Sequence, residues 1–116
     1  MAGRETIYKI CPASVWAAAE AAGEFAGHGD DFRDGFIHFS TGAQLAETAS
    51  RHFAGKADLV LIAVDAADCG GALKWEPSRG GGLFPHLYGT LDPARILWCR
   101  PLPLGPGGHQ FPDLKP

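Results

Sequence analysis

The sequence predicts an α+β protein with a mixed, mainly antiparallel sheet and two main helices. Residues 59–64 (LVLIAV) are apolar throughout, which is typical of a central strand buried on both faces. Residues 14–22 are rich in alanine, and residues 41–53 carry apolar side chains at helical spacing, so both segments favour helices. Strands and helices do not alternate as repeated βαβ units, which argues against a parallel sheet.

The N-terminal third predicts one strand, one helix and one loop. Residues 6–10 alternate as a short strand. Pro12 suits the first turn of a helix, and Gly23 is a suitable end for the helix over 14–22. Residues 28–34 contain three aspartates whose spacing does not fit a calcium loop, so we expect a solvated loop there.

The next segment predicts a strand followed directly by a helix. Residues 35–40 read as one strand, with His38 and Ser40 on the same face. Thr41 and Gln44 have the spacing of a capping box, in which each residue satisfies a backbone N–H of the other. A helix should therefore start at Thr41.

Further strands are expected after the central one. Residues 72–76, 83–88 and 95–99 read as strands, and the glycine-rich residues 77–82 as a flexible loop. We expect residues 1–100 to form a single domain. Five of the sixteen residues in 101–116 are proline, which predicts an extended, mobile tail that adds little to the core.

Composition restricts the partners that we expect. The net charge is −3 and the basic residues are scattered, so nucleic acid is not an expected partner. The N-terminal charges are not followed by an apolar stretch and the longest apolar run has six residues, so we expect neither a signal peptide nor a membrane span. The odd number and wide spacing of Cys11, Cys69 and Cys99 indicate reduced thiols. Because neither a signal peptide nor a membrane span is expected, we expect a cytoplasmic protein, and we take a monomer as the working expectation.

Residues 37–41 form the first candidate site. The imidazole of His38 and the hydroxyl of Ser40 can reach one point, and Thr41 stands where free backbone N–H groups favour an anion. The alternative is a structural histidine followed by a simple helix cap. His38, His52 and His86 lack a local metal-ligand spacing, so no metal site is expected.

Residues 75–89 form the second candidate site. Arg79 can hold a phosphate or carboxylate at two points, and Gly80 lets the backbone approach a ligand closely. Glu76 can accept hydrogen bonds from sugar hydroxyls or stabilise a developing positive charge, and His86 adds an imidazole.

Aromatic side chains accompany these polar groups. Trp75, Phe84 and Tyr88 can stack on a flat ring. The alternative is that the aromatic rings pack in the core while Glu76 and Arg79 form a local ion pair. The two interpretations stay open at this point.

Together these residues resemble a known family over about residues 7–97. The segments that carry the resemblance are IYKI at 7–10, GFIHFST at 35–41 with Gln44, DLVL at 58–61, WEPSRGG at 75–81 and FPHLYG at 84–89. They are similar to the bacterial domain-of-unknown-function family numbered 952.

The resemblance implies an ADP-ribosyltransferase-like fold, with a split sheet around a cleft that binds NAD in the enzymes of that fold. It places Lys9 at the basic first-strand position, the segment from His38 to Thr41 at the middle motif, and Glu76 at the catalytic glutamate. No E-x-E or Q-x-E pair surrounds Glu76, and a fold alone does not determine a function.

Three functions follow as hypotheses. The first is binding of a nucleotide or another small anionic ligand in a cleft between the two segments. The second is an enzyme, with NAD as the candidate cofactor, that cleaves or transfers at the ribose with Glu76 and His38 as catalytic residues. The third is a protein-interaction domain that uses the tail from Pro101.

Overall fold

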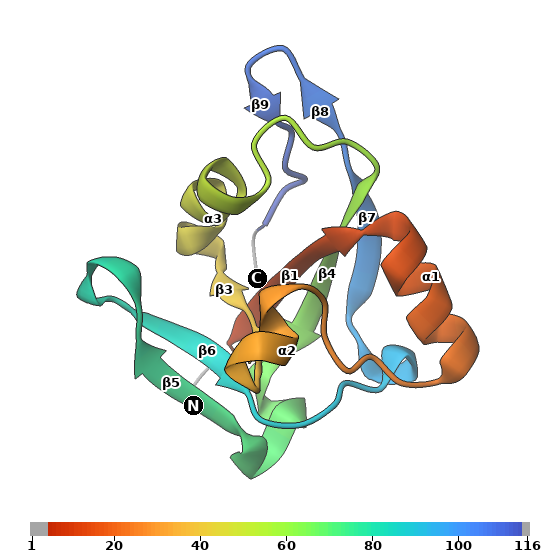
Figure 1. Ribbon diagram of the computed structural model, residues 1–116, viewed down its shortest axis with the longest axis vertical. Helices are drawn as coiled ribbons and strands as arrows, with labels where there is room; N and C mark the ends of the chain where they lie inside the picture. The colour runs from red at the N-terminus through yellow and green to blue at the C-terminus, as the bar shows by residue number, and fades with distance from the viewer. Residues whose placement is uncertain (1–4, 115–116) are drawn as a thin grey trace.

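Two antiparallel sheets make up the frame of the computed structural model, which describes residues 5–114 (Figure 1). The first has the order β3-β1-β4-β7 and contains β1 (Thr6–Pro12), β3 (Ser40–Thr41), β4 (Leu59–Asp65) and β7 (Trp98–Leu102). The second has the order β2-β6-β5 and contains β2 (Ile37–His38), β5 (Leu73–Pro77) and β6 (Leu83–Leu87). The predicted α+β class with a divided antiparallel sheet is confirmed.

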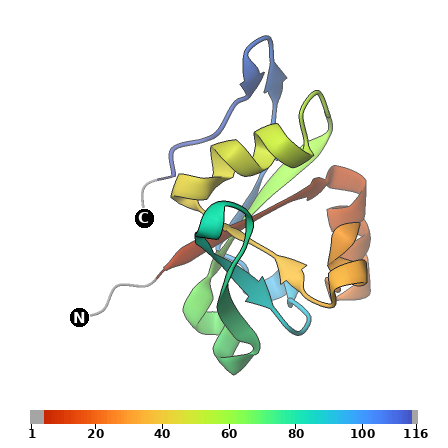
Figure 2. The same cartoon turned by 60° about the vertical axis from the view of Figure 1, so that its left-hand side comes forward.

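Short helices connect the strands and cover the sheets. The α-helices are α1 (Ala13–Ala22), α2 (Asp30–Asp34) and α3 (Leu45–His52). Four 3₁₀ helices are η1 (Gly42–Gln44), η2 (Ala66–Ala72), η3 (Arg79–Gly81) and η4 (Pro93–Arg95). Figure 2 shows α3 and α1 on different sides of the first sheet. Within residues 5–114 no helix has the length and apolar character that crossing a bilayer requires.

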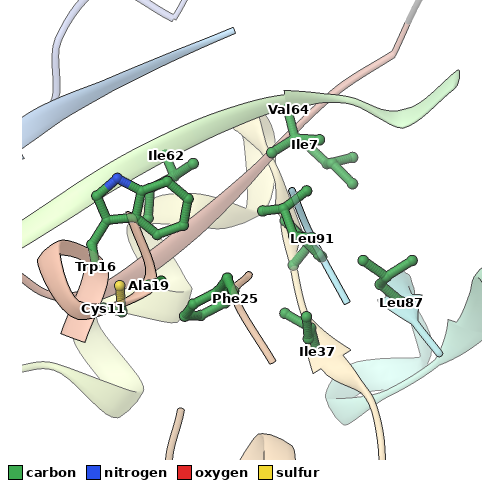
Figure 3. Packing of buried hydrophobic residues seen from close by; sticks show 11 residues of the cluster. Ile7, Cys11, Trp16, Ala19, Phe25, Ile37, Ile62, Val64, Leu87 and Leu91 are labelled. Carbon is green, nitrogen blue, oxygen red and sulfur yellow. The ribbon is translucent and has the colours of Figure 1, made fainter. Parts of the chain in front are cut away.

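The β4 strand lies between β1 and β7 and separates two cores, as its apolar sequence predicts. Ile62 and Val64 belong to one core cluster with Trp16 and Phe25, and Figure 3 shows Ile62 beside Trp16 of α1 and Val64 beside Ile7. Residues Leu59, Leu61 and Ala63 point the other way and join the core under α3. Alternate side chains of one strand thus hold a helix on each face.

The predicted strand over 35–40 is interrupted, which corrects our expectation of one continuous strand. Residues Ile37 and His38 pair with β6 in the second sheet, whereas Ser40 and Thr41 pair with β1 in the first. Phe39 lies between the two short strands and is buried in the core beside α1. Burial of this ring fixes the point where the chain passes from one sheet to the other.

The solvated loop expected over 28–34 is also corrected. Residues Asp30–Asp34 form α2, and Asp31 is only 4% exposed. Two strand boundaries differ as well: β1 continues to Pro12 and β7 begins at Trp98. Pro12 is the last residue of β1, opposite Leu59, and it is also the residue before the first turn of α1.

The segment after residue 100 contributes to the core, contrary to the expected small contribution. Leu102 is 1% exposed, and Phe111 and Leu114 pack against the core under α3. The segment also forms a small hairpin of β8 (Leu104–Gly105) and β9 (Gly108–His109) (Figure 1). Residues 1–4 and 115–116 lie outside the described part of the chain.

Candidate functional site

A polar cavity of about 400 Å³ lies beside the open part of the β1 edge. The β3 strand pairs with Ile7 and Tyr8, and among residues 5–114 no other strand pairs with β1 on that side from Lys9 onward. Strands β1 and β6, the region of α2 and the helix α3 all contribute side chains to the wall. Its charged and imidazole groups belong to Lys9, His28, Asp30, Asp31, Arg33, Asp34, His38, Glu47, Arg51, His52, Lys56 and His86.

Asp31 is the centre of one polar network in this wall. The Lys9 ammonium lies 2.8 Å from Asp31 Oδ2, and His38 Nδ1 lies 2.6 Å from Oδ1. The backbone N–H groups of His28 and His38 also donate to the carboxylate, at 2.9 and 3.1 Å. Although burial alone raises the pKa of Asp31, the bonds from His38 and Lys9 outweigh it and lower the pKa to about 2.

Gly27 makes room for this buried carboxylate. Its φ of +126° lies in a region that side chains disfavour, and an added Cβ would lie 2.8 Å from Asp31 Cβ. The turn before α2 therefore needs glycine at this position to bring the chain close to Asp31.

The second ring nitrogen of His38 is also occupied. Nε2 lies 3.0 Å from Asp34 Oδ2. The Asp34 carboxylate also receives the Arg33 guanidinium at 3.0 Å, and the hydrogen bond from Arg33, with the added charge of His38, lowers the pKa of Asp34. Each ring nitrogen of His38 thus faces a carboxylate oxygen, at 2.6 and 3.0 Å.

A second carboxylate–imidazole pair stands next to the first. His38 and His86 are register partners on β2 and β6, and their ring centres are 5.5 Å apart. His86 Nδ1 lies 2.7 Å from Glu76 Oε1, and the Tyr88 hydroxyl donates to the same oxygen at 2.9 Å. Both bonds lower the pKa of Glu76, and the bond from His86 has the larger effect. The bond to Glu76 raises the pKa of Tyr88.

Phe36 connects the two pairs. Its ring stacks on His86 with centres 4.1 Å apart and an interplanar angle of 24°. It also contacts His38 and Tyr88 at 4.5 and 5.1 Å. The Phe36 ring thus covers one face of His86 and packs against His38 at an interplanar angle of 45°.

His86 differs from His38 in having a free nitrogen. Its Nε2 has no hydrogen-bond partner among residues 5–114. Within the described residues, Trp16 Nε1 is the one fully buried side-chain polar atom without a partner. His86 Nε2 is therefore in contact with solvent, and His86 lines the cavity.

The structure brings together some of the predicted site residues and separates others. Lys9, His38, Ser40, Phe84 and His86 line the cavity. Ser40 is buried there, and its hydroxyl lies 2.8 Å from the Thr48 hydroxyl.

Glu76, Thr41 and Gly80 are not part of the cavity wall. Glu76 stands behind His86, and Thr41 forms the predicted capping box, with its N–H 2.9 Å from Gln44 Oε1. Trp75 is 39% exposed, on the face of β5 opposite Glu76. The side chain of Arg79 lies outside the described part of the structure.

Sequence reasoning missed Asp31, Asp34, Phe36 and Lys56. The two aspartates were assigned to a solvated loop, although a buried lysine on β1 needs a carboxylate partner. The signal that points to one is Lys9 itself, a charged residue inside a short apolar strand. Lys56 lines the cavity and has no carboxylate partner within residues 5–114. No set of three metal-binding side chains occurs among the described residues.

The fold and the cavity define a class of small α+β proteins with two antiparallel sheets and a charged cavity at their junction. A family model described as "Protein of unknown function (DUF952)" matches residues 10–99, and the chain therefore belongs to this family. The family resemblance expected from the motifs is confirmed.

Solved structures of one protein from Caulobacter crescentus, CC0527, are similar to this chain. Its crystal structure is 48% identical, has a TM-score of 0.87 and covers 90% of this chain and 93% of CC0527. The crystal structure of a double mutant gives the same values. The solution NMR structure has a TM-score of 0.80 and covers 90% of each chain. No curated protein matches the sequence.

Proposed function

We propose that the protein binds a small anionic ligand of the nucleotide class in the cavity between α2, α3 and β6. The observation that carries this proposal is a polar wall in which most charged side chains form ion pairs, whereas His86 Nε2, the His28 ring and the Lys56 ammonium have no hydrogen-bond or carboxylate partner among residues 5–114. A volume of about 400 Å³ lies within the range of about 300–1,000 Å³ that is usual for small-molecule sites.

The ligand is expected to place its anionic group at the α3 end. Arg51 and Lys56 bring two cations to that end, although Arg51 is already bound to Glu47 at 2.7 Å. Asp30 and Asp34, at the α2 end, offer oxygens that accept hydrogen bonds from hydroxyl or amino groups. This separation of charge suits a molecule with a phosphate at one end and a hydroxylated or nitrogen-rich group at the other.

The proposal includes an ADP-ribosyltransferase-like fold and NAD as a candidate ligand. Two antiparallel sheets with a cavity at their junction support it. Contact between Glu76 and the ribose is not part of the proposal, because Glu76 is bound to His86 and Tyr88 behind the cavity wall. The free thiols of Cys11, Cys69 and Cys99 support a cytoplasmic setting.

The test is a binding titration followed by amide NMR. AMP, NAD and ribose 5-phosphate are added to the full chain, with adenosine as the uncharged comparison. We expect saturable shifts at Ser40, His86 and Lys56 for the phosphates. Lys56→Ala should weaken AMP binding about tenfold because it removes a charged hydrogen-bond donor, whereas Lys74→Ala on β5 should not. Absence of shifts with all the phosphates would reject the proposal.

A further inference from the structure

We infer that His86 is a general base in the cavity and that Glu76 is its positioning residue. The inference rests on the proposed function, because it gives that same cavity a reaction. The sequence analysis predicts Glu76 and His38 as catalytic residues at a ribose, whereas this inference makes His86 the catalytic residue.

The carboxylate determines which nitrogen of His86 carries the proton. The pKa of Glu76 is lowered by its bonds to His86 and Tyr88, so this carboxylate is ionised and only accepts hydrogen bonds. His86 Nδ1, at 2.7 Å, must therefore donate to it. In the neutral ring the lone pair is then on Nε2, the nitrogen without a protein partner.

Packing holds the ring in this orientation. The His86 side chain is 6% exposed and stacks on Phe36 at 4.1 Å. Glu76 is itself held by Tyr88 at 2.9 Å. A carboxylate bound to the far nitrogen also stabilises the imidazolium that forms when Nε2 accepts a proton. His86 thus has an orienting group, a fixed tautomer and an open nitrogen.

The neighbouring histidine cannot take this part. His38 Nδ1 and Nε2 are 2.6 and 3.0 Å from the carboxylates of Asp31 and Asp34, so both nitrogens are occupied by protein groups. The His38 ring centre lies 5.5 Å from that of His86. His38 therefore has a structural role, and His86 is the ring that can transfer a proton.

The step is the activation of water, and an activated acyl ester serves as the probe because water can attack it without the ester being recognised by the protein. Nε2 takes a proton from water as the water oxygen bonds to the acyl carbon. When the ester C–O bond breaks, the leaving oxygen takes that proton from Nε2. The products are an acid and an alcohol, and water is the only co-reactant.

The test is the hydrolysis of 4-nitrophenyl acetate by the full chain between pH 5 and pH 9. General-base catalysis is typically worth about 100-fold or more, so His86→Gln should lose about that factor. His109→Gln, in the β9 hairpin outside the cavity wall, should be unchanged. Glu76→Gln should lose less and should move the acid limb of the pH–rate profile to lower pH, because the neutral amide no longer stabilises the imidazolium.

Two results would overturn the inference. One is a wild-type rate equal to that of His86→Gln. The other is a pH–rate profile of Glu76→Gln that is lowered in rate but not shifted along the pH axis. This second measurement remains valid even if His86→Gln does not fold. AMP binding without hydrolysis would reject the base and keep the proposed function. Hydrolysis without any phosphate binding would keep the base and reject the proposed function.

Discussion

The two carboxylate–imidazole pairs of this protein are neighbours with different surroundings. Asp31, which binds His38, is 4% exposed and also accepts a lysine ammonium and two backbone N–H groups. Glu76, which binds His86, has a side chain that is 35% exposed and accepts one further bond, from Tyr88. The first pair uses all its bonding capacity within the fold, whereas the second leaves one nitrogen open. The first pair therefore stabilises the folded state, and the second has a nitrogen available to a ligand.

The largest effect should come from breaking the first pair. Lys9→Met removes the ammonium that lies 2.8 Å from a buried carboxylate. Removal of one partner of a buried ion pair costs about 3–5 kcal/mol in the free energy of unfolding, because the other charge is left uncompensated. Urea unfolding measures the loss, and Lys74→Met at an exposed position of β5 is the matched control. Equal stability of the two variants would show that the Lys9–Asp31 pair is not the anchor described.

The next effect is the pH dependence that Asp31 confers. The pKa of Asp31 is about 2 in the folded protein, and that of an unfolded aspartate is about 3.9. A lowered pKa in the folded state contributes stability above the unfolded value and loses it as the pH falls through the folded value. The contribution is about 2 kcal/mol at neutral pH and is lost between about pH 5 and pH 2.

The measurement is urea unfolding at a series of acidic pH values. Asp31→Asn should flatten the decrease relative to the wild type, and the difference between the two curves isolates Asp31 from the other carboxylates. Parallel curves for the wild type and Asp31→Asn would contradict the assigned pKa.

The smallest effect concerns the ring between the two pairs. Phe36→Leu keeps an apolar side chain but removes the stacking on His86 and the contact with His38. Aromatic pairs contribute about 0.5–1.5 kcal/mol beyond burial, so the free energy of unfolding should fall by about this amount. Phe32→Leu, at a ring that is 65% exposed, should have no such effect. Thermal unfolding compares the two, and a larger loss in Phe32→Leu would contradict the bridging role of Phe36.

Several elements of the fold can be predicted from short stretches of sequence. The apolar run 59–64 predicts the central β4, and Thr41 with Gln44 predicts the cap before α3. The interruption at Phe39 is not local, since it depends on which sheet each half of the segment pairs with. The position of α2 does not follow from local sequence either. Asp31 is buried there because it pairs with Lys9, which is distant in sequence and lies on β1.

The candidate site shows the same limit. Residue types alone single out His38 and His86, and strand alternation places Phe84 and His86 on one face of β6. The carboxylate partner of each imidazole is determined by the tertiary structure, because Asp31 and Glu76 reach the rings from α2 and β5. Sequence reasoning therefore found the imidazoles but did not show which of them has an open nitrogen.

The most direct test of the account is the proton position on His86. Long-range ¹H–¹⁵N NMR of the unliganded protein at pH 8, where imidazoles are normally neutral, distinguishes the two ring nitrogens. The account predicts a protonated Nδ1 bound to Glu76 and an unprotonated Nε2. A proton on Nε2, with the lone pair on Nδ1, would contradict it.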